Sequence, residues 1–521
     1  MTGSVGETGP APGRRRAATA AVVALALAGL GGGLFVLGSS LPSGSAVVSL
    51  PNRPVDGGAA NPLDLGAHNS PTVVRNPVNP AELAIVNRVD LPQFSCALHV
   101  SDDAGATWAD VPIPFPAGEE QPPRCFAPDA GFGPDGTLYL AFVTLAGRGN
   151  LPNAVWLVTS TDSGRTLSAP TKVAGPLAFH LRLLADPVRT GGLYLTWLQA
   201  SAVGNLSFAG PVHVVLARSG DGGATWSRPV TVDDAAGAAG GRRLLAPAPA
   251  ADRRGGLYVA YLDLLDDRLD YDGAHQGLGG EPYGGPWRLV VSRSQDGGAT
   301  WTETVVDAAL TPTERVVALF PPAPTLAVDG RHVYVAFADG RLGDADVWVW
   351  SSHDGGTRFA APARVNDTPK GDRTDQYRPK LAVAPDGRLD VAYYDRRADP
   401  ANVMTEVSIQ SSADHGRTFS RRLPLSDRAF DSRIGFGADR ALPDLGSRLG
   451  LASTKAGALA AWADTRAGTD VSLKQDVAVA ATRLSSGSPA RRPLQAAGLA
   501  VALLASAAGV ATVGTARRRA R

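Results

Sequence analysis

An all-β fold, a β-propeller of four-stranded blades, is what this sequence predicts, and two observations lead to it. A turn of the form Ser-x-Asp-x-Gly-x-Thr-Trp occurs six times in variants, and successive copies lie 58 to 60 residues apart except for one step of 75. Repetition at such a period indicates one supersecondary unit copied along the chain. The composition, with 60 Gly, 40 Pro and 6% aromatic residues, favours many short strands joined by tight turns.

Each residue type in the repeated turn has a local physical reason. The Asp side chain can accept hydrogen bonds from backbone amides of the turn, and Gly supplies a positive φ. The aromatic ring that follows can fill space between neighbouring sheets. Six equivalent sites cannot all be an active site, so we expect a structural role for these aspartates, which are Asp103, Asp162, Asp221, Asp296, Asp354 and Asp414.

Each repeat predicts four strands in a fixed order. A Pro-led apolar stretch such as 378–383 comes first, an alternating stretch such as 138–142 second, a third strand runs into the turn, and the aromatic residue opens the fourth. The second-strand signature occurs once more at each end, at 83–86 and 459–462, so the count predicts seven blades. A six-bladed ring with a degenerate extra unit is the alternative. The stretch 46–50 could supply the fourth strand of the last unit and close the ring.

The two ends of the chain carry apolar segments beside arginines. A segment of about 20 apolar residues can span a bilayer, and arginines at both chain ends indicate cytoplasmic termini with the propeller outside the cell membrane. The predicted organisation is a cytoplasmic basic N-terminus at 1–16, a signal peptide or membrane anchor at 17–38, a linker with the ring-closing strand at 39–69, the propeller at 70–482, a linker at 483–493, a transmembrane helix at 494–514 and a cytoplasmic basic tail at 515–521.

Charge and cysteine content narrow the partners. The formal net charge of +1 carries no polyelectrolyte signature, so we expect no nucleic-acid partner. Cys96 and Cys125 both lie in the part predicted to be exported, where an even pair most simply forms one disulfide.

The repeated turns are those of the bacterial neuraminidase (BNR) repeat, or Asp-box, and the chain resembles the sialidase-like superfamily of β-propellers over about residues 70–482. It is also similar to actinobacterial cell-surface proteins labelled exo-α-sialidase. For a true sialidase the resemblance implies three arginines that grip the sialic acid carboxylate, an Asp acid/base, and a Tyr nucleophile assisted by Glu. The family's Arg-Ile-Pro motif near the first blade is not found; Asn69-Ser70-Pro71-Thr72 stands there.

Topology indicates which face to search. The Asp-boxes join third and fourth strands on one face, whereas loops between second and third strands, and between blades, lie on the opposite face, where the superfamily binds ligands. Arginines near the starts of first strands could bind a carboxylate through their planar guanidinium groups. Asp395 belongs to an Asp-x-Arg pattern that recurs at the ends of second strands. That pattern could fix loops or line a charged rim. The candidate catalytic residues are Arg378, Arg448, Arg182, Tyr271, Glu281 and Asp395.

The step of 75 residues contains an insertion at 263–287 on the same predicted face. A long loop rich in acids and Gly is often functional. It could supply a Tyr/Glu pair through Tyr271 and Glu281, or remain a solvated acidic loop. We expect no cofactor apart from a structural Ca²⁺ that this loop could bind through carboxylate oxygens of Asp263, Asp266, Asp267 and Asp270.

Two functions remain open at this point. The first is a membrane-tethered glycoside hydrolase of exo-α-sialidase type that acts on surface or environmental glycans outside the cell. The alternative is a surface propeller that binds a glycan or a protein without chemistry. The fold alone does not separate them.

Overall fold

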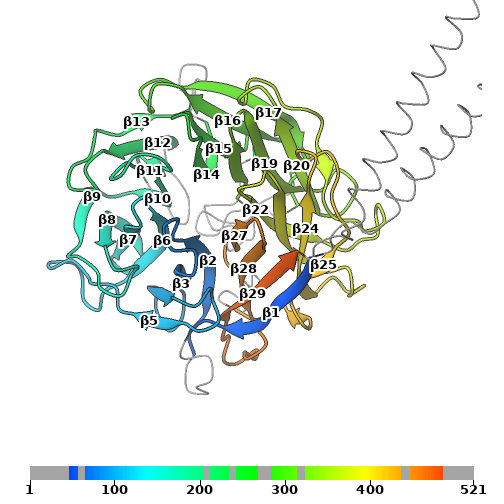
Figure 1. The fold of residues 1–521 in the computed structure, drawn as a ribbon, viewed down its shortest axis with the longest axis horizontal. Coiled ribbons are helices and arrows are strands. Elements are labelled where there is room, and N and C mark those ends of the chain that lie inside the picture. The colour runs from blue at the N-terminus through cyan, green and yellow to red at the C-terminus, as the bar shows by residue number, and fades with distance from the viewer. Residues whose placement is uncertain are drawn as a thin grey trace, which may run out of the picture. The chain divides into compact units, whose positions relative to one another are not determined.

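The computed structural model describes residues 46–56, 65–202, 212–233, 242–267, 283–313, 323–435 and 445–484. They form seven antiparallel sheets arranged around an axis (Figure 1). In six sheets four strands follow one another in chain order from the axis outward, and in the seventh the outermost strand is the first strand of the described chain. The propeller therefore has seven blades, and the six-bladed alternative is wrong. The expected terminal apolar segments, 17–38 and 494–514, lie outside the described residues. Within the described ranges no helix is long and apolar enough to cross a membrane.

The strands of blades 1 to 4 have the following bounds. Blade 1 comprises β2 (His68–Arg75), β3 (Leu83–Val89), β4 (Ser95–Ser101) and β5 (Ala109–Val111). Blade 2 comprises β6 (Cys125–Phe132), β7 (Leu138–Ala146), β8 (Leu151–Ser160) and β9 (Thr171–Ala174). Blade 3 comprises β10 (Ala178–Ala185), β11 (Leu193–Ala200), β12 (Val212–Ser219) and β13 (Val230–Thr231). Blade 4 comprises β14 (Leu244–Ala251), β15 (Leu257–Asp263), β16 (Trp287–Ser294) and β17 (Thr302–Leu310).

Blades 5 to 7 complete the ring. Blade 5 comprises β18 (Thr325–Asp329), β19 (His332–Asp339), β20 (Asp346–Ser352) and β21 (Ala363–Arg364). Blade 6 comprises β22 (Gln376–Val383), β23 (Leu389–Asp395), β24 (Met404–Ser412) and β25 (Leu423–Pro424), and β26 (Phe430–Asp431) also pairs with β24. Blade 7 comprises β27 (Gly450–Thr454), β28 (Gly457–Asp464), β29 (Asp476–Leu484) and, outermost, β1 (Ala46–Pro54). The first strand of the propeller thus belongs to its last blade, where Figure 1 shows blue β1 beside orange β29.

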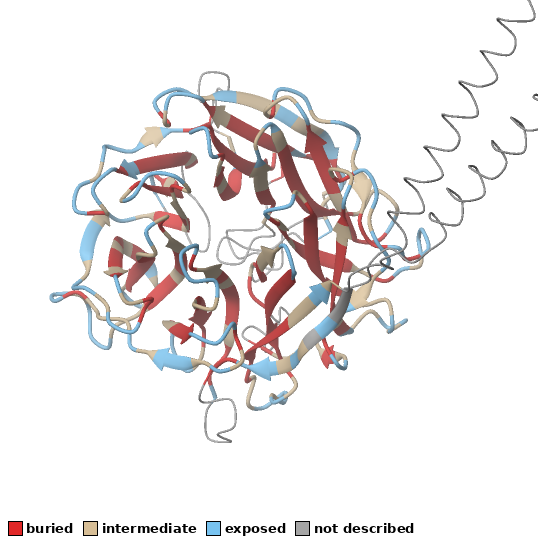
Figure 2. Cartoon of the chain, in the orientation of Figure 1, coloured by how far each residue is buried: buried red, intermediate tan, exposed pale blue. Residues whose placement is uncertain are grey.

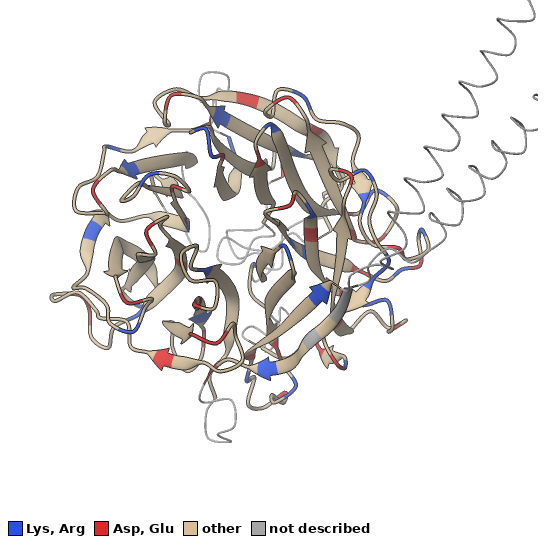
Figure 3. Ribbon diagram, in the orientation of Figure 1, with Lys and Arg blue, Asp and Glu red and all other residues tan. Residues whose placement is uncertain are grey.

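The core lies between the blades. Every residue of the second strands β3, β15 and β23 is buried, because both faces of each sheet are covered by neighbouring sheets. The short outer strands are largely exposed or half-buried (Figure 2). Basic and acidic residues are interspersed around the ring (Figure 3).

The Asp-box hydrogen bonds explain the repeated sequence, and blade 3 illustrates them. The Ser219 hydroxyl donates to Asp221 at 2.8 Å, and Asp221 accepts both the hydroxyl and the amide N–H of Thr225 at 2.5 and 2.9 Å. These hydrogen bonds, first those from Thr225, lower the pKa of Asp221 to about 2. Gly223 has a φ of +90°, and a Cβ there would lie 2.1 Å from Leu157 of blade 2. Glycine is therefore required for both the turn and the approach of the blades.

Covalent and ionic bridges join several neighbouring blades. Cys96 of β4 and Cys125 of β6 form the expected disulfide between blades 1 and 2. The Asp-x-Arg arginines join later blades, since each pairs with the Asp of its own second strand and with an acid of the preceding blade. These bridges, which we call the inter-blade clasps, are Arg341 with Asp339 and Asp307, Arg397 with Asp395 and Asp367, and Arg466 with Asp464 and Asp427.

Three histidines meet on the Asp-box face between blades 5 and 6. His332 stacks on His415 with ring centroids 4.1 Å apart, and its Nδ1 lies 2.8 Å from Nδ1 of His353. The Tyr334 hydroxyl is 3.1 Å from Nδ1 of His415. We call these three histidines the histidine cluster. Burial and the two other histidines lower the pKa of His332.

Candidate anion-binding site on the propeller axis

The innermost strands share a backbone distortion. In five blades the register of the first and second strands shifts at a bulge, and the bulged residue has a positive φ although it is not glycine. The φ values lie between 48° and 54°, a conformation that costs a side-chain-bearing residue about 1–3 kcal/mol. Bulges re-aim the side chains around them. The five bulged residues are Ser70, Ala127, His180, Ala246 and Arg378.

A small cavity opens where four of these bulges meet, those of blades 1 to 4. Its walls come from the inner strands of blades 1 to 4, together with Arg88 at the end of β3, Ala323 just before blade 5, and Ser447 and Arg448 just before blade 7. This lining places the cavity on the axis. We call it the axial pocket. Its volume is about 30 Å³, enough for two or three non-hydrogen atoms but far below the several hundred Å³ of a site that encloses a sugar ring.

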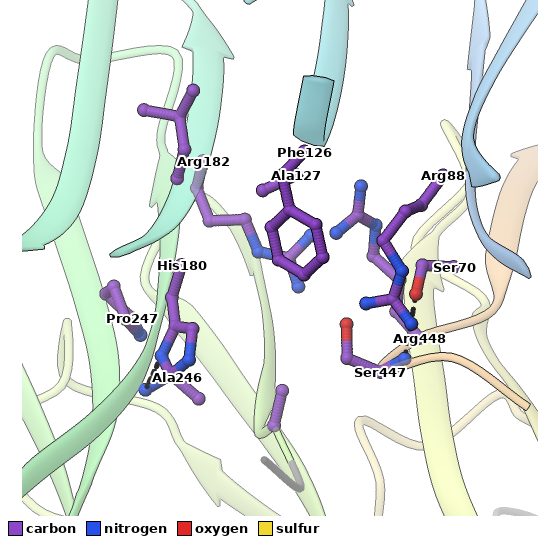
Figure 4. A pocket seen from close by; sticks show the side chains of 12 residues that line it. Ser70, Arg88, Phe126, Ala127, His180, Arg182, Ala246, Pro247, Ser447 and Arg448 are labelled. Carbon is purple, nitrogen blue, oxygen red and sulfur yellow. Dashed lines mark hydrogen bonds between the residues drawn. The ribbon is translucent and has the colours of Figure 1, made fainter. Parts of the chain in front are cut away.

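Three arginines converge on the axial pocket from different blades (Figure 4). Arg88, from β3, stacks 4.9 Å over the Phe126 ring and donates to Asp90 at 2.8 Å. A terminal guanidinium nitrogen of Arg182, from β10, lies 4.0 Å from a carboxylate oxygen of Asp129. Arg448 donates through Nε to the Thr72 hydroxyl at 2.9 Å and through a terminal nitrogen to the Pro128 carbonyl.

Among the described residues, positive charge exceeds negative charge at this point of the axis. Asp129 is the acid shared by Arg182, Arg448 and Lys380, and it also accepts the Thr72 hydroxyl at 2.8 Å. Burial first, and then repulsion by Arg182, lowers the pKa of Lys380 to about 8 and that of Arg448 to about 9. The lowered pKa of Arg448 thus reflects its burial beside another cation. An anion placed among these groups would compensate the excess charge.

His180 adds a hydrogen-bonding group to the pocket wall. The Ala246 amide donates to Nδ1 of His180 at 3.3 Å, which links blade 3 to blade 4. A neutral imidazole that accepts at Nδ1 carries its proton on Nε2 and can donate there. The axial pocket therefore combines guanidinium groups and an imidazole, a set suited to a carboxylate or another small anion.

The structure brings two of the six candidate catalytic residues together, Arg182 and Arg448. Arg378 lies on the β22 bulge with its guanidinium 5.9 Å from the Tyr377 ring and does not line the axial pocket. Asp395 is fully buried within blade 6, where it accepts from Arg397 at 2.7 Å and from Ser408 at 2.7 Å. Its catalytic role stays a prediction, as does that of Arg378. Tyr271 and Glu281 lie outside the described residues.

The acidic insertion is described only in part. Asp263 is paired with Arg242 at 2.9 Å, and Asp267 accepts the indole N–H of Trp287 at 2.9 Å. Asp266 is exposed, and Asp270 lies outside the described residues. In the described ranges no group of three His, Cys, Asp or Glu side chains could hold a metal ion. The Ca²⁺ site stays a prediction.

Sequence reasoning missed Asp129, Lys380 and His180. A usable signal exists in the repeat register. Asp129, Arg182 and Lys380 occupy the same position of their first strands, opposite the fourth residue of the second-strand signature. A charged residue at this position of an otherwise apolar inner strand would have indicated the axis.

Comparisons with known proteins add the following findings. No protein-family model and no curated protein matches the chain. Solved structures that are similar include a protein of unknown function from Dyadobacter fermentans (TM-score 0.46, 14% identity, 84% of this chain and 99% of that one) and a Penicillium chrysogenum α-L-arabinanase complexed with arabinobiose (0.44, 17%, 71% and 98%). A third is the Hadza microbial sialidase Hz136 (0.42, 15%, 80% and 65%).

The fold and the axial pocket define a seven-bladed Asp-box propeller with a cationic centre. The seven blades and their Asp-box turns agree with the fold that the repeated sequence predicted. Likenesses as distant as those above carry no argument about activity, so the function is argued from the chain's own residues.

Proposed function

We propose that this protein is a membrane-tethered, extracellular, sialidase-like propeller that binds acidic glycans of cell surfaces or of the environment. The observation that carries the proposal is the excess of cations around the Asp129 carboxylate, because two of these cations, Arg182 and Arg448, line the axial pocket. Arg182, Lys380 and Arg448 share Asp129, so an acidic group of the ligand would restore charge balance. A volume of about 30 Å³ suits the carboxylate of a sugar acid while the sugar ring stays at the mouth.

The location is supported by the chain ends and by the disulfide. Disulfides persist mainly in oxidising, extracytoplasmic compartments, and the Cys96–Cys125 bridge is present. The apolar segments 17–38 and 494–514, each beside arginines, support a tether at one or both ends.

Hydrolysis of sialosides is the second candidate function, and the meeting of Arg182 with Arg448 favours it. A sialidase also needs a Tyr/Glu pair and an Asp acid/base near the carboxylate site. Tyr271 and Glu281 remain the candidates for the pair. Binding requires only the axial pocket, so we place binding first.

The decisive experiment separates binding from turnover. Full-length protein purified in detergent is titrated calorimetrically with N-acetylneuraminic acid, glucuronic acid and neutral galactose. We expect an acidic sugar to bind and galactose not to bind. Arg182→Met should lower the affinity for the acidic sugar about tenfold or more, which is the effect of losing one charge-assisted hydrogen bond. The matched control is Arg228→Met, because Arg228 is exposed and its side chain makes no ion pair in the described part of the chain.

Equal binding of acidic and neutral sugars, or unchanged affinity in Arg182→Met, would contradict the proposed anion recognition. A fluorogenic sialoside is tested in parallel. Absence of turnover by the wild-type protein would remove the hydrolase candidate and leave the binding proposal intact.

A further inference from the structure

A second and larger cavity lies on the same face as the axial pocket, at the junction of blades 1 and 2. It encloses about 450 Å³, within the range of sites that hold a sugar unit. Three segments line it: 90–94 between β3 and β4, 120–124 leading into β6, and 147–150 between β7 and β8. We call it the junction groove.

The junction groove and the axial pocket share a wall. Phe126 lines the axial pocket and meets Phe94 of the junction groove edge to face, with ring centroids 5.4 Å apart. Arg88 of the axial pocket is paired with Asp90 of the groove. These two contacts place the axial pocket and the junction groove on opposite sides of one layer of side chains.

Hydrogen bonds, an ion pair and the disulfide connect the walls of the groove. Arg124 donates to the Gly147 carbonyl at 2.9 Å and is paired with Glu120 at 2.9 Å, so it ties together two of the three lining segments. The Cys125 amide donates to the Phe94 carbonyl at 3.3 Å, and the disulfide fixes the same wall. A preformed site loses less conformational entropy when it binds a ligand.

The rim of the groove carries chemistry suited to a sugar. Gln93 and Arg148 are exposed, and their side chains make no hydrogen bond or ion pair within the described ranges, so their donors are available to ring hydroxyls. Pro92 and Pro122 are also exposed and can pack against the apolar C–H face of a pyranose. The groove thus offers polar and apolar contacts together, as sugar-binding sites require.

We propose that the junction groove binds the neutral pyranose unit linked to the acidic unit whose carboxylate occupies the axial pocket. The ligand is then at least a disaccharide that runs from the axis over the junction of blades 1 and 2. This inference rests on the proposed binding of acidic glycans. It adds that recognition depends on chain length.

The test compares ligands of different length on the full-length protein in detergent. The probes are N-acetylneuraminic acid against 3′-sialyllactose, and glucuronic acid against the hyaluronan disaccharide. In at least one pair we expect the longer ligand to bind about tenfold more tightly, a difference reasonable for one additional buried sugar unit. The double substitution Gln93→Ala with Arg148→Ala should remove this advantage and leave the affinity for the monosaccharide within twofold of wild type.

Both substituted residues are exposed, so the variant should keep the wild-type thermal midpoint, and Arg228→Ala serves as the matched arginine control. Equal affinity for long and short ligands would refute the proposal that the junction groove binds a second sugar unit, and so would a length advantage that persists in the double variant. Neither result would contradict anion binding in the axial pocket. Failure of every acidic probe to bind the wild-type protein refutes the proposed function as well.

Discussion

Replacing Arg341 by methionine should destabilise the ring at the junction of blades 4 and 5. One terminal nitrogen of Arg341 donates to Asp339 at 2.7 Å and to Asp307 of blade 4 at 2.8 Å. The side chain also lies over the indole rings of Trp348 and Trp350, at 5.3 and 5.5 Å. Methionine keeps an apolar chain of similar length against these rings, so the substitution removes mainly the charge and its hydrogen bonds.

The size of the effect follows from what Asp339 retains. Its carboxylate is fully buried, and a buried charge that loses its partner costs about 3–5 kcal/mol. In the variant it still accepts the backbone N–H of residue 341 at 2.7 Å and that of Thr311 at 3.4 Å. These remaining donors should reduce the loss, and we expect the free energy of unfolding to fall by about 2–4 kcal/mol.

Guanidinium chloride unfolding, followed by tryptophan fluorescence, measures this loss because Trp350 donates to Asp307 within the same clasp. Arg228→Met is the matched control and should change stability by less than about 0.5 kcal/mol. Asp307→Asn completes a double-mutant cycle, in which we expect a coupling energy of about 1 kcal/mol or more. A decrease below about 1 kcal/mol in Arg341→Met, or additivity in the cycle, would refute the clasp as a stabilising bridge.

Three further predictions concern pH and redox state. Because the pKa of His332 is lowered in the folded state, neutral His332 contributes fully to stability above pH 6.5 and contributes less as the pH falls. The thermal midpoint of His332→Gln should therefore decrease less than that of wild type between pH 7 and 5. Burial and the charge of Asp56 raise the pKa of Asp476 to about 8. The contribution of protonated Asp476 to stability is therefore complete below about pH 4 and is lost as the pH rises through 8. Asp476→Asn should raise the thermal midpoint more at pH 8.5 than at pH 5. Reduction of the Cys96–Cys125 disulfide, which closes a loop of 29-residue separation, should lower the free energy of unfolding by about 3–4 kcal/mol.

One result would contradict each of these three predictions. If the thermal midpoint of His332→Gln falls with pH as steeply as that of wild type, His332 is not the group whose titration lowers stability. Equal effects of Asp476→Asn at both pH values would mean that this carboxyl titrates normally. An unfolding midpoint insensitive to reductant would show that the disulfide does not stabilise the blade junction.

Repeat spacing was sufficient to predict the architecture, because each blade is encoded by a short local pattern. The second-strand signature at 83–86 and 459–462 led to seven blades, and the stretch 46–50 falls within β1. The Asp-x-Arg pattern was ambiguous because the second acid of each bridge, such as Asp307 for Arg341, belongs to the preceding repeat. Contacts between blades depend on residues about 30 to 40 positions apart, which a pattern within one repeat does not reveal.

The candidate site was harder to predict than the fold. Side chains at the axis come from several blades, so their proximity depends on ring closure. Arg182 and Arg448 were identified from their place near first strands, whereas Arg88 comes at the end of a second strand. Lys380 stands two residues after the Arg378 bulge, and only the shifted register places it near Asp129.

The position of β1 in blade 7 affects how the chain matures. β1 ends at Pro54, and its partner β29 begins only at Asp476, so this strand emerges first and pairs last. At about 5–20 residues per second, synthesis leaves the strand waiting for roughly 20–80 seconds. During that time its unpaired edge, and later that of β29, could pair with another copy of the chain, and the ring protects both edges only once it is complete.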